Sequence, residues 1–208
     1  MDSIIKGGTE ITFDKTTLRF SFQKEDGCRW RWDKSYMPYM ECRSGNIFFH
    51  DAGEITHELL HTGVGEGILS TYCGFKKEGK IMPYKFQTLV WVEEATGDVY
   101  CEWIPLCEEG LEVKKVFWPG PMEFEEKKGS WYTLLTHQQG ILIPNTWEVE
   151  FQTPVFDGMF GTAGAYMPWF AQVRDGEGYL AVCVTPWNSG YQAEHPAGGS
   201  YTSITSFK

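Results

Sequence analysis

Turn-forming sequences recur about every ten to fifteen residues along this chain, and that spacing limits its fold more than any other feature. Between the turns, apolar and polar residues alternate with the period of a half-buried strand. The clearest case joins residues 86–93, through the turn at 95–98, to residues 99–104. This pattern predicts a β-hairpin.

Similar patterns predict further strands. A second hairpin is expected from residues 169–173 and 179–184, joined by the tight turn at 174–178. The remaining expected strands are two within 9–22 that flank Asp14 and Lys15, a pair at 131–136 and 140–143, and one at 147–151. Helical periodicity is short and confined to residues 54–62 and 107–113.

We therefore expect an all-β fold, a large antiparallel β-sandwich with few short helices, in one domain over residues 1–208. A sandwich of this length is an ordinary size for a single domain. Residues 201–208 still alternate like a strand, so we also expect this domain to be the N-terminal part of a larger protein.

Composition and charge narrow the classes of partner. The chain has nine Trp, ten Tyr and fourteen Phe, residues that favour strands and also line ligand sites. Its formal net charge of −10 repels phosphate backbones and anionic lipid, so we expect neither nucleic acid nor membrane as a partner. A neutral or cationic ligand suits this charge better, while the oligomeric state is left open.

The cysteines and the first residues bear on the compartment. The six cysteines show no closely spaced pairs, which favours reduced, buried thiols: Cys28, Cys42, Cys73, Cys101, Cys107 and Cys183. The first residues contain no apolar segment typical of a signal peptide. Both observations predict a cytoplasmic protein.

The sharpest short motif is the sequence HELLH at residues 57–61. On a helix, His57 and His61 would lie on one face and could bind zinc together, with Glu58 as the general base on the metal-bound water. This gives one hypothesis, a zinc-dependent metallohydrolase. The neighbouring Gly53 and Gly63 would confine the helix to about nine residues, which is short for a rigid metal site.

The alternative interpretation of HELLH is an edge strand or a turn with two surface histidines and an exposed glutamate. No further histidine follows at the spacing of the longer zinc-protease motifs, and no other motif supplies a third ligand. We favour this interpretation, in which the domain has no cofactor, no metal ligand and no catalytic residue.

Carboxylates next to aromatic residues are candidates for glycoside hydrolysis, which requires a pair of them. Glu93 and Glu94 follow Trp91, and Glu102 precedes Trp103. A chain with 28 acidic residues provides such neighbours by chance, so we favour solvent-facing positions on the hairpin.

The stretch at residues 185–199 is the best candidate for a binding surface. It is rich in glycine and proline, follows a predicted strand, and combines aromatic side chains with amide, carboxylate and imidazole groups. Aromatic faces stack on sugar rings while polar groups bind the hydroxyls. We therefore predict a carbohydrate-binding set that also includes an aromatic residue just upstream: Trp169, Trp187, Asn188, Tyr191, Glu194 and His195. The alternative is that these aromatic residues fold back onto the core.

Several longer stretches resemble a known family. They are TGVGEGI at 62–68, the run at 90–105, the run at 131–145, AYMPWF at 165–170 and the loop around Trp187. Together they resemble the N-terminal supersandwich domain, of the galactose mutarotase-like type, in large glycoside hydrolase-like proteins of the endo-α-N-acetylgalactosaminidase type.

This resemblance implies a carbohydrate-associated domain that precedes a catalytic (β/α)₈ barrel and is not catalytic by itself. The catalytic carboxylates would lie in the barrel, so the resemblance transfers no catalytic residue to this chain. The implied partners are a carbohydrate or the barrel itself. A third hypothesis is a structural domain that binds another protein through its aromatic surface.

Overall fold

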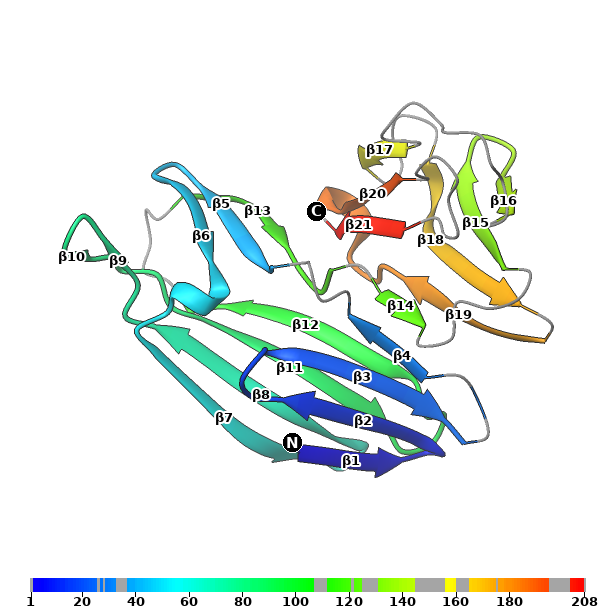
Figure 1. Cartoon of the computed structure of the whole chain (residues 1–208), viewed down its shortest axis with the longest axis horizontal. Helices are drawn as coiled ribbons and strands as arrows, with labels where there is room; N and C mark the ends of the chain where they lie inside the picture. Colours follow the sequence, from blue (N-terminus) through cyan, green and yellow to red (C-terminus); the bar gives the residue numbers. More distant parts are fainter. Residues whose placement is uncertain are drawn as a thin grey trace. The chain divides into compact units, whose positions relative to one another are not determined.

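The computed structural model describes residues 2–25, 27, 29–32, 37–106, 112–120, 122–124, 131–144, 156–159, 165–174, 176–194 and 203–207. These residues form antiparallel strands, the turns between them and two 3₁₀ turns (Figure 1). The all-β prediction is confirmed. Within the described part of the chain, no helix is long and apolar enough to cross a membrane.

The chain divides into two compact units, residues 1–119 and residues 120–208. We call them the first and the second unit and describe each by itself. The expectation of one β-sandwich domain over 1–208, in the supersandwich arrangement, stays a prediction.

The first unit contains most of the strands. In chain order they are β1 (Asp2–Lys6), β2 (Thr9–Asp14), β3 (Arg19–Lys24), β4 (Arg29–Trp32), β5 (Tyr39–Cys42), β6 (Gly45–Phe48), the 3₁₀ turn η1 (Phe49–Asp51), β7 (Glu54–His61), β8 (Gly65–Cys73), β9 (Lys76–Lys77), β10 (Lys80–Ile81), β11 (Phe86–Glu93), β12 (Val99–Pro105) and β13 (Val113–Phe117).

Two sheets of the first unit pack face to face. Strands β1, β2, β3 and β4 lie in this order in one of them, and the other has the order β12-β11-β8-β7. We name the second of these the β8–β11 sheet after its central strands. Phe13 of β2 stacks on Phe20 of β3 at 4.4 Å and meets the ring of His57 on β7 at 4.9 Å, so the apolar faces of the two sheets meet. Ile11, Phe13 and Val92 are buried between them.

Backbone atoms fix the spacing of these two sheets where the β1–β2 and β11–β12 turns meet. There a Cβ on Gly7 would lie 2.5 Å from the backbone nitrogen of Gly97, closer than packed atoms allow. Thr9 Oγ1 donates a hydrogen bond of 2.7 Å to the Gly97 carbonyl beside this contact. Elsewhere on the β8–β11 sheet, Phe49 of η1 packs against its rings, 5.3 Å from Tyr72 and 4.5 Å from Phe86.

The second unit is smaller. Its elements are β14 (Met122–Phe124), β15 (Tyr132–His137), β16 (Ile141–Pro144), β17 (Phe156–Met159), β18 (Ala165–Arg174), β19 (Glu177–Val182), the 3₁₀ turn η2 (Pro186–Asn188), β20 (Gly190–Glu194) and β21 (Ser203–Phe207).

The core of the second unit lies between two sheets. One has the order β16-β15-β18-β19 and is named here the β15–β18 sheet; the other has the order β17-β20-β21. Phe170 of β18 approaches Tyr191 of β20 at 5.3 Å between ring centres. A cluster of buried side chains surrounds this contact: Leu135, Ile143, Phe170, Tyr191 and Ala193.

The predicted hairpins agree with the structure. Strands β11 and β12 pair in the expected register, with Val90 opposite Cys101, and β18 pairs with β19. The predictions for 9–22 and for 131–143 are also confirmed, as β2–β3 and β15–β16. The strand expected at 147–151 lies outside the described residues, as do residues 107–111 of the second predicted helix, whose last residue instead begins β13.

The helical alternative for residues 54–62 is wrong and the favoured interpretation as an edge strand is confirmed, because Glu54–His61 form β7 at the edge of the β8–β11 sheet. Eight residues of β7 pair with β8, from Glu54 opposite Cys73 to His61 opposite Glu66. These non-local backbone hydrogen bonds outweigh the weak helical period of a short segment.

The expectation of buried thiols holds for one cysteine in the described part of the chain. Cys42 is buried, Cys73 and Cys183 are half-buried, and Cys101 is exposed, all four without a disulfide. Cys28 and Cys107 lie outside the described residues.

Candidate functional site

The two histidines of HELLH are too far apart on β7 to share a metal ion. In a strand, residues i and i+4 are separated by about 13 Å, whereas in a helix they lie about 6 Å apart on one face. Glu58 also projects to the face opposite His57 and His61, because side chains alternate along a strand. The zinc hydrolase hypothesis and the roles of His57, His61 and Glu58 in it are therefore wrong. Among the described residues, no three His, Cys, Asp or Glu side chains gather as a metal site.

Each histidine of β7 has a structural partner instead. His57 Nδ1 lies 2.8 Å from Ser70 Oγ on the neighbouring strand, and its ring meets Phe13 edge-on. Burial lowers the pKa of His57, and nearby Lys15 lowers it further. His61 Nδ1 lies 3.4 Å from Glu66 Oε1, which also pairs with Lys6 at 3.0 Å.

The carboxylates beside the tryptophans lie on solvent-facing positions. Glu102 is exposed and accepts a hydrogen bond of 2.7 Å from Trp91 Nε1, while Trp91 stacks on Tyr100 at 4.3 Å. Glu93 accepts a hydrogen bond from the Thr96 hydroxyl in the turn that follows β11. These contacts fit the interpretation that the acids are outward-facing residues of a hairpin.

Trp187 is the most exposed large apolar side chain of the predicted carbohydrate set. It lies in η2, between β19 and β20, and 89% of its surface is accessible. The turn is held from both sides: Ser189 Oγ donates to the Thr185 carbonyl at 2.7 Å, and the Ser189 amide donates to the Pro186 carbonyl at 3.2 Å. Val184, just before the turn, is 77% exposed. A fully presented indole on a short, closed turn is a suitable stacking surface for an apolar ring face.

Tyr191 lies in the core, not on the surface. Its accessible fraction is 0%, it belongs to the cluster around Phe170, and burial raises its pKa to about 12. The ring offers no free face for a sugar, so we leave Tyr191 out of the proposed binding set. The stretch expected to be an irregular loop is also partly regular, because residues 190–194 form β20 between β17 and β21.

The other members of the predicted set are spread over two elements. Trp169 lies on β18, opposite Val182 of β19, and is half-buried. The backbone of Asn188 and Glu194 is described in η2 and β20 while their side chains are not, and His195 lies outside the described residues. The binding role of these residues therefore stays a prediction.

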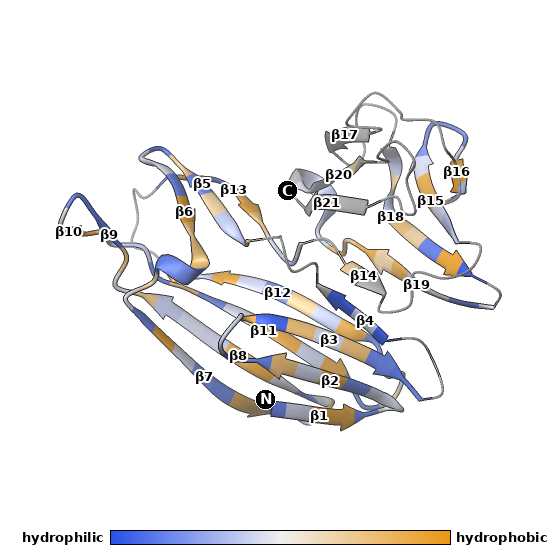
Figure 2. Ribbon diagram, viewed as in Figure 1, coloured by the Kyte–Doolittle hydropathy of each residue, from blue (hydrophilic) through white to orange (hydrophobic). Residues whose placement is uncertain are grey.

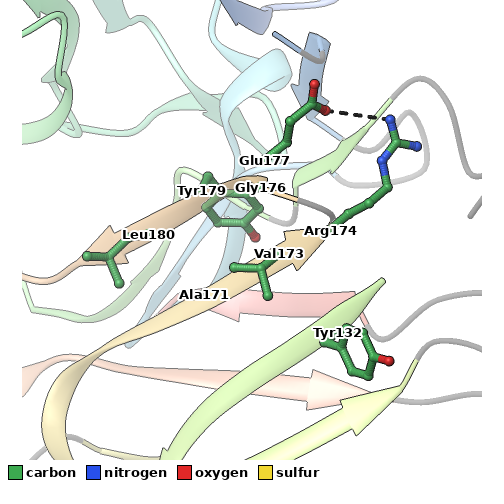
Figure 3. Close-up of a pocket in the computed structure, with 9 residues that line it drawn as sticks. Tyr132, Ala171, Val173, Arg174, Gly176, Glu177, Tyr179 and Leu180 are labelled. Carbon is green, nitrogen blue, oxygen red and sulfur yellow. Dashed lines mark ion pairs between the residues drawn. The ribbon is translucent and has the colours of Figure 1, made fainter. Parts of the chain in front are cut away.

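A surface depression that we did not expect from the sequence lies on the β18–β19 hairpin (Figure 3). Its volume is about 480 Å³, and its apolar lining includes Tyr132, Val173 and Leu180. An ion pair of 3.5 Å between Arg174 and Glu177 lies at the hairpin end (Figure 3). The sequence signal was present: these strands have apolar residues at successive positions, which is typical of strands covered on both faces.

The described fold has a counterpart inside a glycoside hydrolase, matched over the whole of this chain. That enzyme is the α-N-acetylgalactosaminidase NagBb from Bifidobacterium bifidum. The chain is 44% identical to it, with a TM-score of 0.88 against its complex with Gal-NHAc-DNJ and the same values against its GalNAc complex. Against the ligand-free enzyme the TM-score is 0.85.

The match covers 100% of this chain but 33% of the enzyme, so the chain spans about a third of the length of that relative. The predicted resemblance to a domain of glycoside hydrolase-like proteins is thereby confirmed. No family model matches the chain, and neither does any curated protein.

Proposed function

We propose that this chain is a carbohydrate-associated β domain of a glycoside hydrolase that acts on α-linked N-acetylgalactosamine, and that the domain is not catalytic alone. One observation carries the proposal: at 44% identity the whole chain matches a third of an α-N-acetylgalactosaminidase. On this proposal the catalytic carboxylates belong to a separate domain of the longer protein. That catalytic domain and the carbohydrate are the two partners of this chain.

Trp187 is the residue of this chain that we assign to the sugar. Its exposed indole presents an apolar face, and such faces stack on the C–H side of pyranose rings. The turn that holds Trp187 is closed by Ser189, so the side chain starts from a fixed backbone. Asn188, Glu194 and His195, close in sequence, complete the proposed contact set, whereas Trp169 is in register with Val182 of β19 and shares the face of those strands.

The proposal is tested with two proteins. The first is the isolated 208-residue chain; the second is a hybrid in which this chain replaces the matched third of the B. bifidum enzyme. The substrate is p-nitrophenyl N-acetyl-α-D-galactosaminide. We expect no release of p-nitrophenol by the isolated chain and measurable release by the hybrid. A folded hybrid without activity would contradict the proposal.

The role of Trp187 is tested in the same hybrid. If the indole stacks on the sugar, Trp187→Ala raises KM by about tenfold, the loss of one contact of about 1.4 kcal/mol. The melting temperature should not change, because an exposed side chain contributes little to stability. Ile81→Ala is the control, since Ile81 is 73% exposed but lies in the first unit. An unchanged KM for Trp187→Ala would remove Trp187 from the sugar site.

A specific observation also favours the third hypothesis, that the domain binds protein. The depression on β18–β19 is lined mainly by apolar residues, whereas sugar sites also need polar groups that bind hydroxyls. The two functions are compatible if they use different surfaces of the second unit, Trp187 for the sugar and the strands for a protein partner.

A further inference from the structure

The β15–β18 sheet has one face that does not take part in the core of the second unit. Side chains alternate along each strand, so residues in register with one another share a face. Phe170 and Leu135 point into the core, which places their neighbours along β18 and β15 on the opposite side. This opposite side, named here the outer face, carries Tyr132, Leu134, Leu142, Val173, Leu180 and Val182.

The outer face is apolar and open to solvent in this chain. Leu180 is 60% exposed, Val182 55% and Leu142 54%. None of the described side chains at the outward-facing positions of these four strands is charged, although 22% of all residues in the chain are. Apolar side chains gathered on one face of a sheet are unusual on a surface that stays in water, and they mark a surface that another molecule covers.

The depression gives this face the form of a docking surface. Tyr132, Val173 and Leu180 line an apolar hollow of about 480 Å³, and the Arg174–Glu177 ion pair lies at its end (Figure 3). An apolar centre is a usual feature of a protein–protein contact. The hollow is large enough for a big apolar side chain from a partner, the kind of anchor that dominates such contacts.

We propose that the outer face of the β15–β18 sheet docks the part of the longer glycoside hydrolase that this chain does not contain. The occupant follows from length: the matched enzyme is about three times as long as the match, so about two thirds of it remain to contact this domain. This inference rests on the proposed function, because it takes the occupant from the same longer protein. The partner surface would be apolar and would insert a large side chain between Tyr132 and Leu180.

The test compares the same substitution in two contexts. Leu180→Asp places a charge on the outer face of the isolated chain and of the hybrid described above. In the isolated chain the side chain is in water, so we expect the melting temperature to stay within about 1 °C. In the hybrid the charge is buried without a partner, and we expect the melting temperature to fall by about 5 °C or more.

Leu59→Asp is the matched control. Leu59 is 56% exposed, close to the 60% of Leu180, but it lies on β7 in the first unit. It should change the melting temperature equally in the isolated chain and in the hybrid. Equal effects of Leu180→Asp in the two contexts would overturn the docking surface.

Further outcomes separate the alternatives. An active hybrid in which Leu180→Asp is silent overturns the docking surface and leaves the proposed function standing, whereas a folded, inactive hybrid overturns the proposed function. Light scattering could also show that the isolated chain is a dimer. If Leu180→Asp dissociates that dimer, the face belongs to a second copy and the proposal is overturned.

If the hybrid does not fold, aspartate is placed in the intact B. bifidum enzyme at the position that superposes on Leu180. A loss of melting temperature there supports the docking surface, and no change overturns it.

Discussion

The β8–β11 sheet of the first unit and the β15–β18 sheet of the second are built alike but face different surroundings. Both are four-stranded and antiparallel, and both bury mainly apolar side chains on the inner face. In both sheets hydrophobic and hydrophilic residues follow one another along the strands (Figure 2), and their opposite faces differ in charge. The outward-facing side of the β8–β11 sheet carries carboxylates on its edge strands β7 and β12 and on β11. They are Glu54, Glu58, Glu93 and Glu102. The outward-facing side chains described for the β15–β18 sheet include no carboxylate.

The inner face of each sheet reflects the fold, whereas the opposite face reflects what surrounds the sheet. The outward side of the β8–β11 sheet is organised by polar contacts between neighbouring strands, such as Gln87 Nε2 to Thr71 Oγ1 at 3.0 Å and Trp91 Nε1 to Glu102 at 2.7 Å. Contacts of this kind suit a surface in water. The outer face of the β15–β18 sheet consists of apolar side chains instead.

The two inner faces are expected to contribute equally to stability. Phe86 and Phe170 are 0% and 1% exposed, one on each inner face. Phe86→Ala and Phe170→Ala should each lower the free energy of unfolding by about 3–5 kcal/mol, because each leaves a cavity. Urea unfolding followed by tryptophan fluorescence measures both. A loss below about 1 kcal/mol for one variant would show that its inner face is loosely packed and that the two inner faces do not contribute equally.

The two opposite faces should respond differently to loss of a polar group. Trp91→Phe removes the hydrogen bond to Glu102 while keeping a ring on Tyr100, and it should cost about 1 kcal/mol in urea unfolding. Tyr132→Phe is the matched change on the outer face of the other sheet. It should cost less than about 0.5 kcal/mol, because the Tyr132 side chain is 37% exposed. Equal costs would contradict the contrast between the faces.

A smaller effect is expected from His57 of the β8–β11 sheet, which should make the free energy of unfolding decrease as pH falls. Burial lowers the pKa of His57 in the folded state, so the unfolded chain binds the proton more readily. The stability that neutral His57 provides is present above its unfolded pKa of about 6.5 and is lost as pH falls toward its lowered folded value. Urea unfolding between pH 7.5 and pH 5.5, values chosen to bracket that unfolded pKa, should therefore show a slope in the wild type. His57→Gln should flatten it, and an equal slope in the variant would assign the effect to another group.

The smallest expected effect is that of zinc. Because His57 and His61 are about 13 Å apart along β7, they cannot bind one ion together. Zinc at several times the protein concentration should therefore leave the melting temperature unchanged, as should EDTA. A rise that disappears in the variant His57→Ala plus His61→Ala would contradict the strand assignment of β7.

Local signals were sufficient to predict the hairpins. The turn at 95–98 and the tight turn at 174–178 lie between strands that are neighbours in sequence, so their pairing needs no distant information. Residues 54–62 differ, because their state depends on pairing with β8, and a short apolar segment fits a helix or a strand equally well.

The candidate site was predictable only in part, for a similar reason. Trp187 lies in a turn bounded by Pro186 and Ser189, where exposure follows from local structure. Tyr191 lies four residues later, yet β17 and β21 on either side of its strand turn its ring into the core. Local composition describes both residues equally well, and only the pairing of distant strands distinguishes them.

The contact between Gly7 and Gly97 has a consequence for how this domain can evolve. At that end of the first unit the two sheets meet through backbone atoms, so any side chain at either position would force the sheets apart. Where Phe49 packs on Tyr72 and Phe86, by contrast, side chains make the contact, and large apolar residues can replace one another there in compensating pairs. Homologous domains are therefore expected to keep both glycines while these aromatic residues diverge, which makes this pair of glycines a marker for recognising distant relatives.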